Sequence, residues 1–432
     1  MTKNISVGLL GLGTVGSGVF QIINEHQEEL VHQLGCGVKV EKILVRDVNK
    51  ERGVKVDPMY LTTNPEDVLL NPEIDVVIEV MGGIDETRNY ILEAFKVKKH
   101  VVTANKDLMA LHGPELQQAA HENGCDLFYE ASVAGGIPII RGLADGLSPD
   151  KIQKVMGIVN GTTNYILTKM TDEGVSYEDA LLEAKELGFA ESDPTADVEG
   201  LDAARKMAIL SRLAFSTSVE LEDVQVEGIS GVGVEDLQIG KQLGLTMKLI
   251  GFADFQDAQL EVNVQPTFLR LDHPLAAVKN ENNAVYVNGD AVGETMFYGP
   301  GAGGLPTATA VMSDVVAVIK NLLLDVNARQ FLKPRFEKKL KTPDQSFGSY
   351  YLRLQVENNI QTFSEISTLL TDLKIGVDRI IQAPQQNGET EFIVITRETN
   401  LEKIRTALED LQKASVVKEV KSHYRIEGGI GV

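Results

Sequence analysis

A glycine-rich turn close to the start of the chain constrains the fold more than any other feature. Residues 5–10 form a short apolar run typical of a buried strand, the sequence Gly11-Leu12-Gly13-Thr14-Val15-Gly16 follows at once, and a helical pattern comes next. In this order the first glycine permits a tight turn, the second lets the backbone approach a pyrophosphate, and the third allows close packing of helix on strand. The motif predicts a dinucleotide site, with an ordinary glycine turn as the alternative. Its expected contacts are Gly11, Gly13, Thr14, Val15 and Gly16.

The end of the next apolar run indicates which dinucleotide would bind. Residues 38–45 predict a second strand, and Arg46, Asp47 and Lys50 follow it. An acidic residue at this place binds the adenosine ribose of NAD, whereas an arginine suits the 2′-phosphate of NADP. Arg46 and Lys50 therefore favour NADP, while Asp47 leaves NAD open as a second coenzyme.

Strand and helix patterns continue to alternate after this point. Strands are expected at 75–80, 100–104 and 125–130, and helices at 86–98 and 114–122. Such alternation predicts an α/β fold with a Rossmann-type, doubly wound parallel sheet. Ligands of these sheets collect at the carboxyl ends of the strands. We therefore expect the chemistry at residues 79–83, 103–106 and 130–138.

Composition narrows the class of protein. A length of 432 residues exceeds what one hydrophobic core organises, so several domains are expected. The formal charge of −21 argues against nucleic acid as a partner, because phosphate binding needs a basic face. No run approaches the ~18 apolar residues of a membrane span, which predicts a cytoplasmic protein without membrane contact. The two cysteines, Cys36 and Cys125, provide neither a disulfide framework nor a zinc-binding pattern.

Four later segments resemble monofunctional homoserine dehydrogenases. They are Thr103-Ala104-Asn105-Lys106, the glycine-rich run after Glu130, residues 157–164, and residues 188–206, which read GFAESDPTADVEGLDAARK. The last segment is the most specific, and the resemblance extends over about residues 1–320. It implies the NAD(P)H-dependent interconversion of L-aspartate 4-semialdehyde and L-homoserine, a step in threonine, methionine and isoleucine biosynthesis.

Oxidation of a primary alcohol needs a group that takes the hydroxyl proton as hydride leaves. The resemblance implies that Lys206 is this proton carrier, that Asp202 positions Lys206 or the substrate hydroxyl, and that Lys106 lies near the nicotinamide and substrate. Asp202 and Lys206 share one face of an expected helix at 201–213, where an ordinary surface ion pair would be the alternative. How the two lysines divide the work stays open.

Homoserine carries an ammonium group, so its pocket needs carboxylates. The resemblance implies that Glu191 binds the substrate, and Asp197 lies close to it in the sequence; an acidic cluster at a helix terminus is the alternative. Gly161, Thr162 and Asn164 offer donors for the substrate carboxylate, although Thr and Asn could equally form a helix cap.

The resemblance also implies a cation site and further cofactor contacts. The Glu130 carboxylate and the carbonyl groups of Val133, Gly135 and Ile137 would bind a monovalent cation, sodium, because hard cations accept oxygen ligands. Such an ion would have a structural role. Thr103, Lys106 and Gly303 would contact the cofactor, with a plain glycine loop as the alternative for Gly303.

The expected domain order follows from these motifs. It is a nucleotide-binding domain at 1–135, a substrate-binding and dimerisation α+β domain at 136–300, a return to the nucleotide domain at 301–330, a linker at 331–348, and a βαββαβ domain at 349–432. The last domain resembles ACT domains, which implies threonine as an effector. The Asp-x-Pro-Gly turn of many ACT domains is replaced by residues 357–361, so a purely dimerising role stays open. A homodimer or homotetramer is expected.

Two rival functions remain at this point. An aspartate-semialdehyde dehydrogenase would need a cysteine nucleophile, but Cys125 opens an expected strand at the edge away from the ligands and Cys36 precedes another strand. A non-catalytic nucleotide or amino-acid sensor would fit the C-terminal pattern. The presence of Glu191, Asp202 and Lys206 favours the enzyme.

Overall fold

The computed structural model describes residues 4–328, 333–386 and 389–428. The chain divides into two compact units, each assembled from separated stretches. Unit 1 comprises Met1–Val155, Asp202–Val224 and Asn282–Glu337, and unit 2 comprises Met156–Leu201, Gln225–Glu281 and Lys338–Val432. The segment expected to form a substrate domain, 136–300, is therefore shared between the two units.

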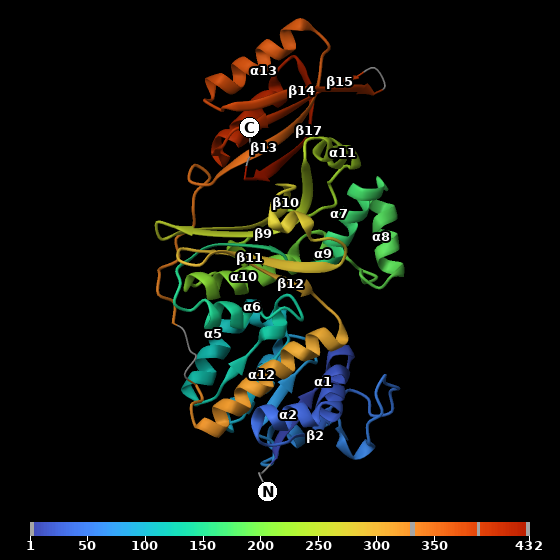
Figure 1. The fold of residues 1–432 in the computed structure, drawn as a ribbon, viewed down its shortest axis with the longest axis vertical. Coiled ribbons are helices and arrows are strands. Elements are labelled where there is room, and N and C mark those ends of the chain that lie inside the picture. Colours follow the sequence, from blue (N-terminus) through green and yellow to red (C-terminus); the bar gives the residue numbers. More distant parts are fainter. Residues whose placement is uncertain (1–3, 329–332, 387–388, 429–432) are drawn as a thin grey trace. The chain divides into compact units, whose positions relative to one another are not determined.

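Unit 1 is built on a six-stranded sheet in the order β3-β2-β1-β4-β5-β6, and every neighbouring pair is parallel. The strands are β1 (Ile5–Leu10), β2 (Val38–Leu44), β3 (Leu61–Thr62), β4 (Val76–Glu79), β5 (His100–Thr103) and β6 (Leu127–Phe128). The helices that join or cover them are α1 (Thr14–Glu25), α2 (Gln27–Leu34), α3 (Glu66–Leu69), α4 (Asp85–Lys96), α5 (Lys106–Glu122) and α12 (Gly304–Leu324) (Figure 1). The predicted doubly wound parallel sheet is confirmed.

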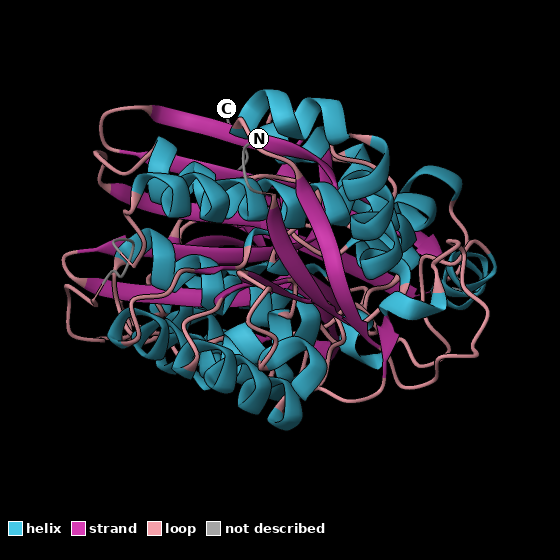
Figure 2. Ribbon diagram, turned by 90° about the horizontal axis from the view of Figure 1, so that it is seen from below, coloured by secondary structure: helices cyan, strands magenta, loops and turns pink. Residues whose placement is uncertain are grey.

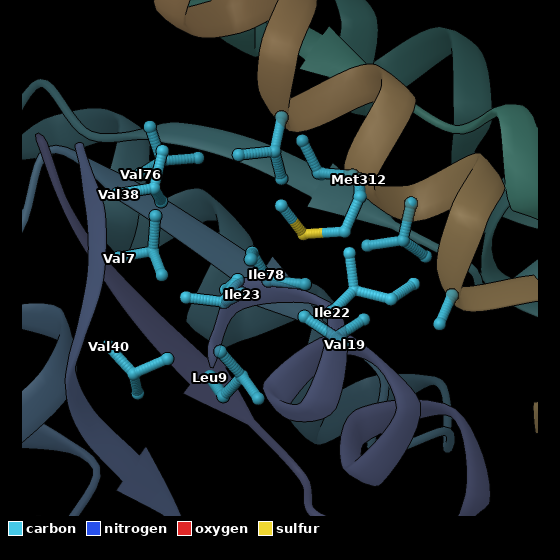
Figure 3. Close-up of a cluster of buried hydrophobic side chains, with 14 of the residues drawn as sticks. Val7, Leu9, Val19, Ile22, Ile23, Val38, Val40, Val76, Ile78 and Met312 are labelled. Carbon is cyan, nitrogen blue, oxygen red and sulfur yellow. The ribbon is translucent and has the colours of Figure 1, made fainter. Parts of the chain in front are cut away.

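The core of unit 1 lies between the sheet and helices α1 and α12. Figure 3 shows Met312 of α12 together with Leu9 of β1 and with Val19 and Ile22 of α1. Helix α12 is long and apolar enough to span a membrane by length and composition, which the sequence reading did not recognise. Its buried face packs on α1, as in the core helix of a globular unit.

Two expected boundaries in unit 1 were wrong. Helix α5 begins at Lys106, not at residue 114, because the Asn105 side chain accepts a hydrogen bond from the Leu108 N–H (3.0 Å) and caps it. Pro114 consequently lies inside the helix. Strand β6 is only two residues long, and Glu130 begins a 3₁₀ turn, Glu130–Ser132.

Other parts of unit 1 come from later in the chain. They are α6 (Ile139–Arg141), helix α10 (Leu201–Phe215) apart from its first residue, and the hairpin of β11 (Asn282–Gly289) and β12 (Gly293–Pro300). Strand β7 (Ile152–Ile158) crosses from unit 1 into unit 2.

Unit 2 combines helices with most of the strands of a mixed sheet. Figure 2 shows the helices and strands of the whole chain by colour. The first elements of unit 2 are α7 (Gly161–Glu173), α8 (Tyr177–Glu186), α9 (Thr195–Val198), β8 (Gln225–Val226), α11 (Val234–Gln242), β9 (Leu245–Gln256) and β10 (Gln259–Arg270). The C-terminal elements are β13 (Phe347–Val356), α13 (Ile360–Asp372), β14 (Val377–Gln386), β15 (Glu389–Thr396), β16 (Thr399–Asn400), α14 (Leu401–Lys413) and β17 (Val417–Glu427). Apart from the short β16, they follow the expected βαββαβ order.

The C-terminal elements are joined to β10 and not merely tethered to it. Strand β17 pairs with β10 in parallel. Buried Asp236 of α11 accepts hydrogen bonds from the hydroxyls of Tyr351 (3.0 Å) and Ser422 (2.7 Å). In the expected linker, residues 329–332 lie outside the description, whereas Lys341 donates its backbone N–H to the Leu260 carbonyl (2.8 Å). The described residues of 338–386 and 389–428 therefore belong to unit 2 and do not form a separate flexible tail.

Candidate active site

A cavity of about 390 Å³ lies in unit 1 at the carboxyl ends of β1 and β2. Gly11 has a φ of +103°, and a Cβ there would lie 2.8 Å from the Met81 Cα. A Cβ on Gly16 would lie 2.4 Å from the Gly11 carbonyl oxygen, whereas nothing lies within 4 Å of one on Gly13. The glycines thus supply the tight turn, the close helix packing and the open approach that a dinucleotide needs.

Charged residues from the segment after β2 also line this cavity. Arg46, Asp47 and Lys50, the residues expected to bind the adenosine end, line it and are exposed. Arg52, which sequence reasoning missed, donates through its guanidinium to the carbonyls of Asp47 and Lys50, the latter at 2.6 Å. Arg52 therefore fixes the turn that carries Arg46 and Lys50 and adds a third positive charge.

Two further cavity residues come from α4. The Tyr90 hydroxyl donates to the Glu86 carboxylate at 2.7 Å, and this bond raises the pKa of Tyr90 to about 12. Across the glycine turn, Gly303 caps α12 with a φ of +121°, and a Cβ on neighbouring Gly304 would lie 3.2 Å from the Thr14 Cγ2. Helix α12 therefore begins next to the glycine turn.

The Thr103 side chain is hydrogen-bonded inside the protein and is not free to contact a ligand. Its buried hydroxyl donates to Glu79 at 2.5 Å, and Glu79 also accepts from the Met81 N–H at 2.9 Å. Burial raises the pKa of Glu79. The Thr103 side chain therefore braces the end of β4.

The two candidate lysines meet at one carboxylate. The Lys106 Nζ lies 3.0 Å from Asp202 Oδ1, and the Lys206 Nζ lies 2.7 Å from Asp202 Oδ2. Asp202 is 4% exposed and Lys206 is 9% exposed, whereas the Lys106 side chain is 39% exposed. Burial excludes a solvated surface pair for Asp202 and Lys206. The arrangement presents two ammonium groups on one anchored carboxylate, with Lys106 nearer to solvent.

The predicted substrate residues lie in unit 2. Asp197 accepts hydrogen bonds from the Asn160 amide (2.7 Å) and the Thr162 hydroxyl (3.3 Å). Asn160, which sequence reasoning missed, also caps α7 through the Thr163 N–H (2.9 Å). Glu191 is exposed. A Cβ on Gly161 would lie 2.6 Å from the Glu281 carbonyl oxygen, so glycine is required there.

Asn164 faces the interior of unit 2. Its side-chain oxygen accepts from the Lys248 Nζ (2.9 Å), which also donates to the Val278 carbonyl (2.6 Å). Burial lowers the pKa of Lys248 to about 8. The Asn164 amide is therefore committed to an internal network that local sequence patterns could not reveal.

The proposed cation loop is folded around Glu130. The buried Glu130 carboxylate accepts from the Ile140 and Arg141 N–H groups at 2.7 and 2.8 Å, and burial raises its pKa. Ala134 and Gly135 have left-handed φ values of +54° and +50°. Within the described residues, no three His, Cys, Asp or Glu side chains gather as a metal site. One carboxylate with backbone carbonyls is a donor set for a hard monovalent cation, not for zinc.

The cysteines are both free and buried. The Cys125 Sγ lies 3.9 Å from the Phe95 carbonyl oxygen, and burial raises the pKa of this thiol to about 11. A thiol in this state is not a nucleophile at neutral pH. Burial also raises the pKa of the Cys36 thiol, so the cysteine-dependent rival is not favoured.

Comparison with known proteins gives one consistent family. The model for the NAD-binding domain of homoserine dehydrogenase matches residues 11–130, and the homoserine dehydrogenase model matches residues 138–316. The homoserine dehydrogenase of Bacillus subtilis is 54% identical over 99% of both chains, and that of Corynebacterium glutamicum is 40% identical over 98% of this chain and 96% of its own.

Solved structures agree with the sequence matches. The crystal structure of a homoserine dehydrogenase from Thiobacillus denitrificans has a TM-score of 0.92 and 38% identity, with 99% of both chains covered. A hyperthermophilic archaeal homoserine dehydrogenase in complex with NADPH has a TM-score of 0.62 and 27% identity, over 76% of this chain and 100% of that one.

Proposed function

Because the chain belongs to the homoserine dehydrogenase family, whose members are NAD(P)-dependent oxidoreductases, we propose that it interconverts L-aspartate 4-semialdehyde and L-homoserine with Lys206 as the proton carrier. The observation that carries this proposal is the buried Asp202 carboxylate with both lysines on it. Bound nicotinamide would supply the hydride to the aldehyde carbon or accept it in the reverse direction.

The protein's own groups would handle the proton. In reduction, the Lys206 ammonium gives its proton to the carbonyl oxygen as that oxygen becomes the alcohol; in oxidation, the neutral amine takes the proton back. Asp202 holds Lys206 at 2.7 Å in both directions. Lys106, the more exposed of the two lysines, stabilises negative charge that develops on the substrate oxygen.

The coenzyme pocket favours NADP, with NAD as a second coenzyme. Arg46 and Lys50 would pair with a 2′-phosphate, and Arg52 holds their turn in place. Thr14, Val15, Gly303 and the backbone near Thr103 complete the proposed contacts. The NADPH complex of the archaeal relative supports this choice.

The substrate and cation assignments rest on donor chemistry and on family resemblance. Glu191 would bind the substrate ammonium, while the backbone N–H groups of Gly161 and Thr162 at the start of α7 would donate to its carboxylate. Asn164 would support this region from the interior. Glu130 and the carbonyls of Val133, Gly135 and Ile137 would hold a sodium-type ion that stabilises the loop.

Location, assembly and regulation are proposed more broadly. We place the protein in the cytoplasm as a homodimer or homotetramer, with threonine as an effector of the C-terminal elements. In place of an Asp-x-Pro-Gly turn, Asn359 caps α13 by accepting from the Gln361 and Thr362 N–H groups at 2.9 Å.

A direct assay tests the function. Purified protein is mixed with L-homoserine and either NADP⁺ or NAD⁺, and absorbance of the reduced nicotinamide is followed. We expect turnover with homoserine and none with L-serine, whose hydroxyl lies one carbon closer to the ammonium group. Failure to oxidise homoserine with either coenzyme contradicts the proposal.

A further inference from the structure

Helix α5, which begins with Lys106, contains an internal proline. Pro114 has no N–H, so the carbonyl of Ala110, four residues earlier, lacks its helical donor. A buried carbonyl without a donor costs free energy, and in this helix it lies little more than one turn from Lys106. Something outside α5 must therefore satisfy it.

Arg212 of α10 supplies the missing donors. Its Nη2 donates to the Ala110 carbonyl at 2.6 Å, its Nη1 donates to the Met109 carbonyl at 2.9 Å, and its Nε donates to the Val219 carbonyl at 2.5 Å. The guanidinium packs against Gly113, where a Cβ would lie 3.5 Å from Nη1, an ordinary van der Waals contact. Arg212 thus satisfies the carbonyl that Pro114 leaves without a helical donor.

Arg212 is not part of an ion pair among the residues that the structure describes. Its bonds go to main-chain carbonyls, and burial lowers the pKa of the guanidinium. A charge in such surroundings is not explained by pairing with a carboxylate. Its contacts instead connect two helices.

Those two helices carry the proposed catalytic lysines. Three contacts join α5 to α10. Lys106 lies 3.0 Å from Asp202, and the Asp107 carboxylate lies 2.8 Å from the Arg205 Nε. The third contact is the hydrogen bond from Arg212 to the Ala110 carbonyl. Lys206 lies on α10 between the last two of these connections. The spacing of the two helices therefore sets the spacing of the lysines at Asp202.

We propose that Arg212 is a positioning residue for the dehydrogenase reaction: by binding the Ala110 carbonyl that Pro114 leaves without a donor, and the neighbouring Met109 carbonyl, it fixes α5 against α10 and so fixes Lys106 and Lys206 on Asp202. In this role Arg212 acts through the two helices and not by contact with the substrate or the coenzyme. The role in catalysis depends on the proposed function, whereas the helix brace does not.

The test is a double-mutant cycle of Arg212→Met and Pro114→Ala. Arg212→Met should lower kcat at least about tenfold, because misplacement of reacting groups by about 1 Å costs up to about 10²-fold, while the KM for NADPH stays within about twofold. Pro114→Ala restores an N–H for Ala110, so alone it should keep kcat within about twofold. In the Pro114→Ala background, Arg212→Met should cost less kcat and less melting temperature than in the wild type.

Arg88→Met is the matched control, because Arg88 pairs with Glu115 on the exposed side of the same helix. It should leave kcat unchanged. If Arg212→Met does not fold, the cycle is run with Arg212→Lys, which replaces the planar guanidinium with one ammonium group on a flexible side chain. Equal losses of kcat in both backgrounds, or a folded Arg212→Met protein with wild-type kcat, overturn the positioning role.

Failure of the proposed function would be seen separately, as absence of homoserine turnover by the wild type. In that case, the melting temperatures of the wild type, the two single variants and the double variant would still show whether Arg212 holds the two helices together. Additive melting temperatures in the cycle would overturn the brace itself, whatever the substrate of the enzyme.

Discussion

Replacement of Lys206 by Met separates a catalytic lysine from a structural one. Lys206 is 9% exposed and lies 2.7 Å from Asp202. Removing one member of a buried pair normally costs about 3–5 kcal/mol, because the other charge is left uncompensated. Here Asp202 keeps a second partner, Lys106 at 3.0 Å, so the expected cost falls to about 1–3 kcal/mol. The variant should fold.

The catalytic loss should be much larger than the loss of stability suggests. General acid–base catalysis contributes about 10²–10⁴-fold, which corresponds to about 3–5 kcal/mol of transition-state stabilisation. Lys206→Met should therefore lower kcat at least about 10²-fold in both directions, since one group gives and takes the same proton. Coenzyme affinity should be unchanged.

The assay compares steady-state kcat in both directions with NADPH binding by fluorescence titration. Lys169→Met is the control, because Lys169 forms an i,i+4 pair with Glu173 at the same 2.7 Å but in unit 2 and outside the proposed site. The control should keep its kcat. A folded Lys206→Met protein with kcat within tenfold of the wild type would refute the assignment and move the proton to Lys106.

Three other expectations follow from the geometry. Arg46→Ala should weaken NADPH binding by about 1.5–3 kcal/mol for a lost charged hydrogen bond and barely affect NADH; equal losses in titrations with both coenzymes would remove Arg46 from the site. Gly13→Ala should fold normally and raise the coenzyme KM. Gly16→Ala should lower the free energy of unfolding by about 1–3 kcal/mol, because its Cβ meets the Gly11 carbonyl at 2.4 Å. Equal free energies of unfolding for the two variants in denaturant titrations would contradict this. Burial lowers the pKa of Lys248 from 10.5 to about 8, so between these pH values the unfolded chain holds a proton that the folded chain has released. The free energy of unfolding should therefore rise by about 3 kcal/mol between pH 8 and 10.5. Urea titrations of Lys248→Met should lack that rise, and an identical pH profile in the variant would show that Lys248 does not cause it.

Local patterns predicted the parallel sheet and the nucleotide turn well, because a strand, a glycine turn and a helix are encoded by neighbouring residues. The start of α5 was missed because Pro114 was taken as the first residue of a helix, where proline is favoured, whereas the Asn105 cap starts the helix earlier. The short β6 ends where Glu130 turns to accept two backbone N–H groups, and those donors come from ten and eleven residues farther along the chain.

The residues that sequence reasoning missed share a physical cause. Arg52 acts on carbonyls of a turn, Lys248 lies 84 residues from Asn164, and Arg212 lies 102 residues from Ala110. Their partners are backbone or amide oxygens, which have no signature in composition or spacing. Asp202, by contrast, was found with Lys206, because the four-residue helical interval is local.

The interleaving of the two units affects how the protein is made. Helix α12 covers the apolar face of α1 and β1, yet it is encoded after residue 303. While the ribosome is still adding residues 156–303, the nascent nucleotide-binding unit exposes Val19, Ile22 and neighbouring residues that the finished chain buries. We expect chains released before α12 is synthesised to bind chaperones or be degraded, even though every glycine of their coenzyme turn is already present.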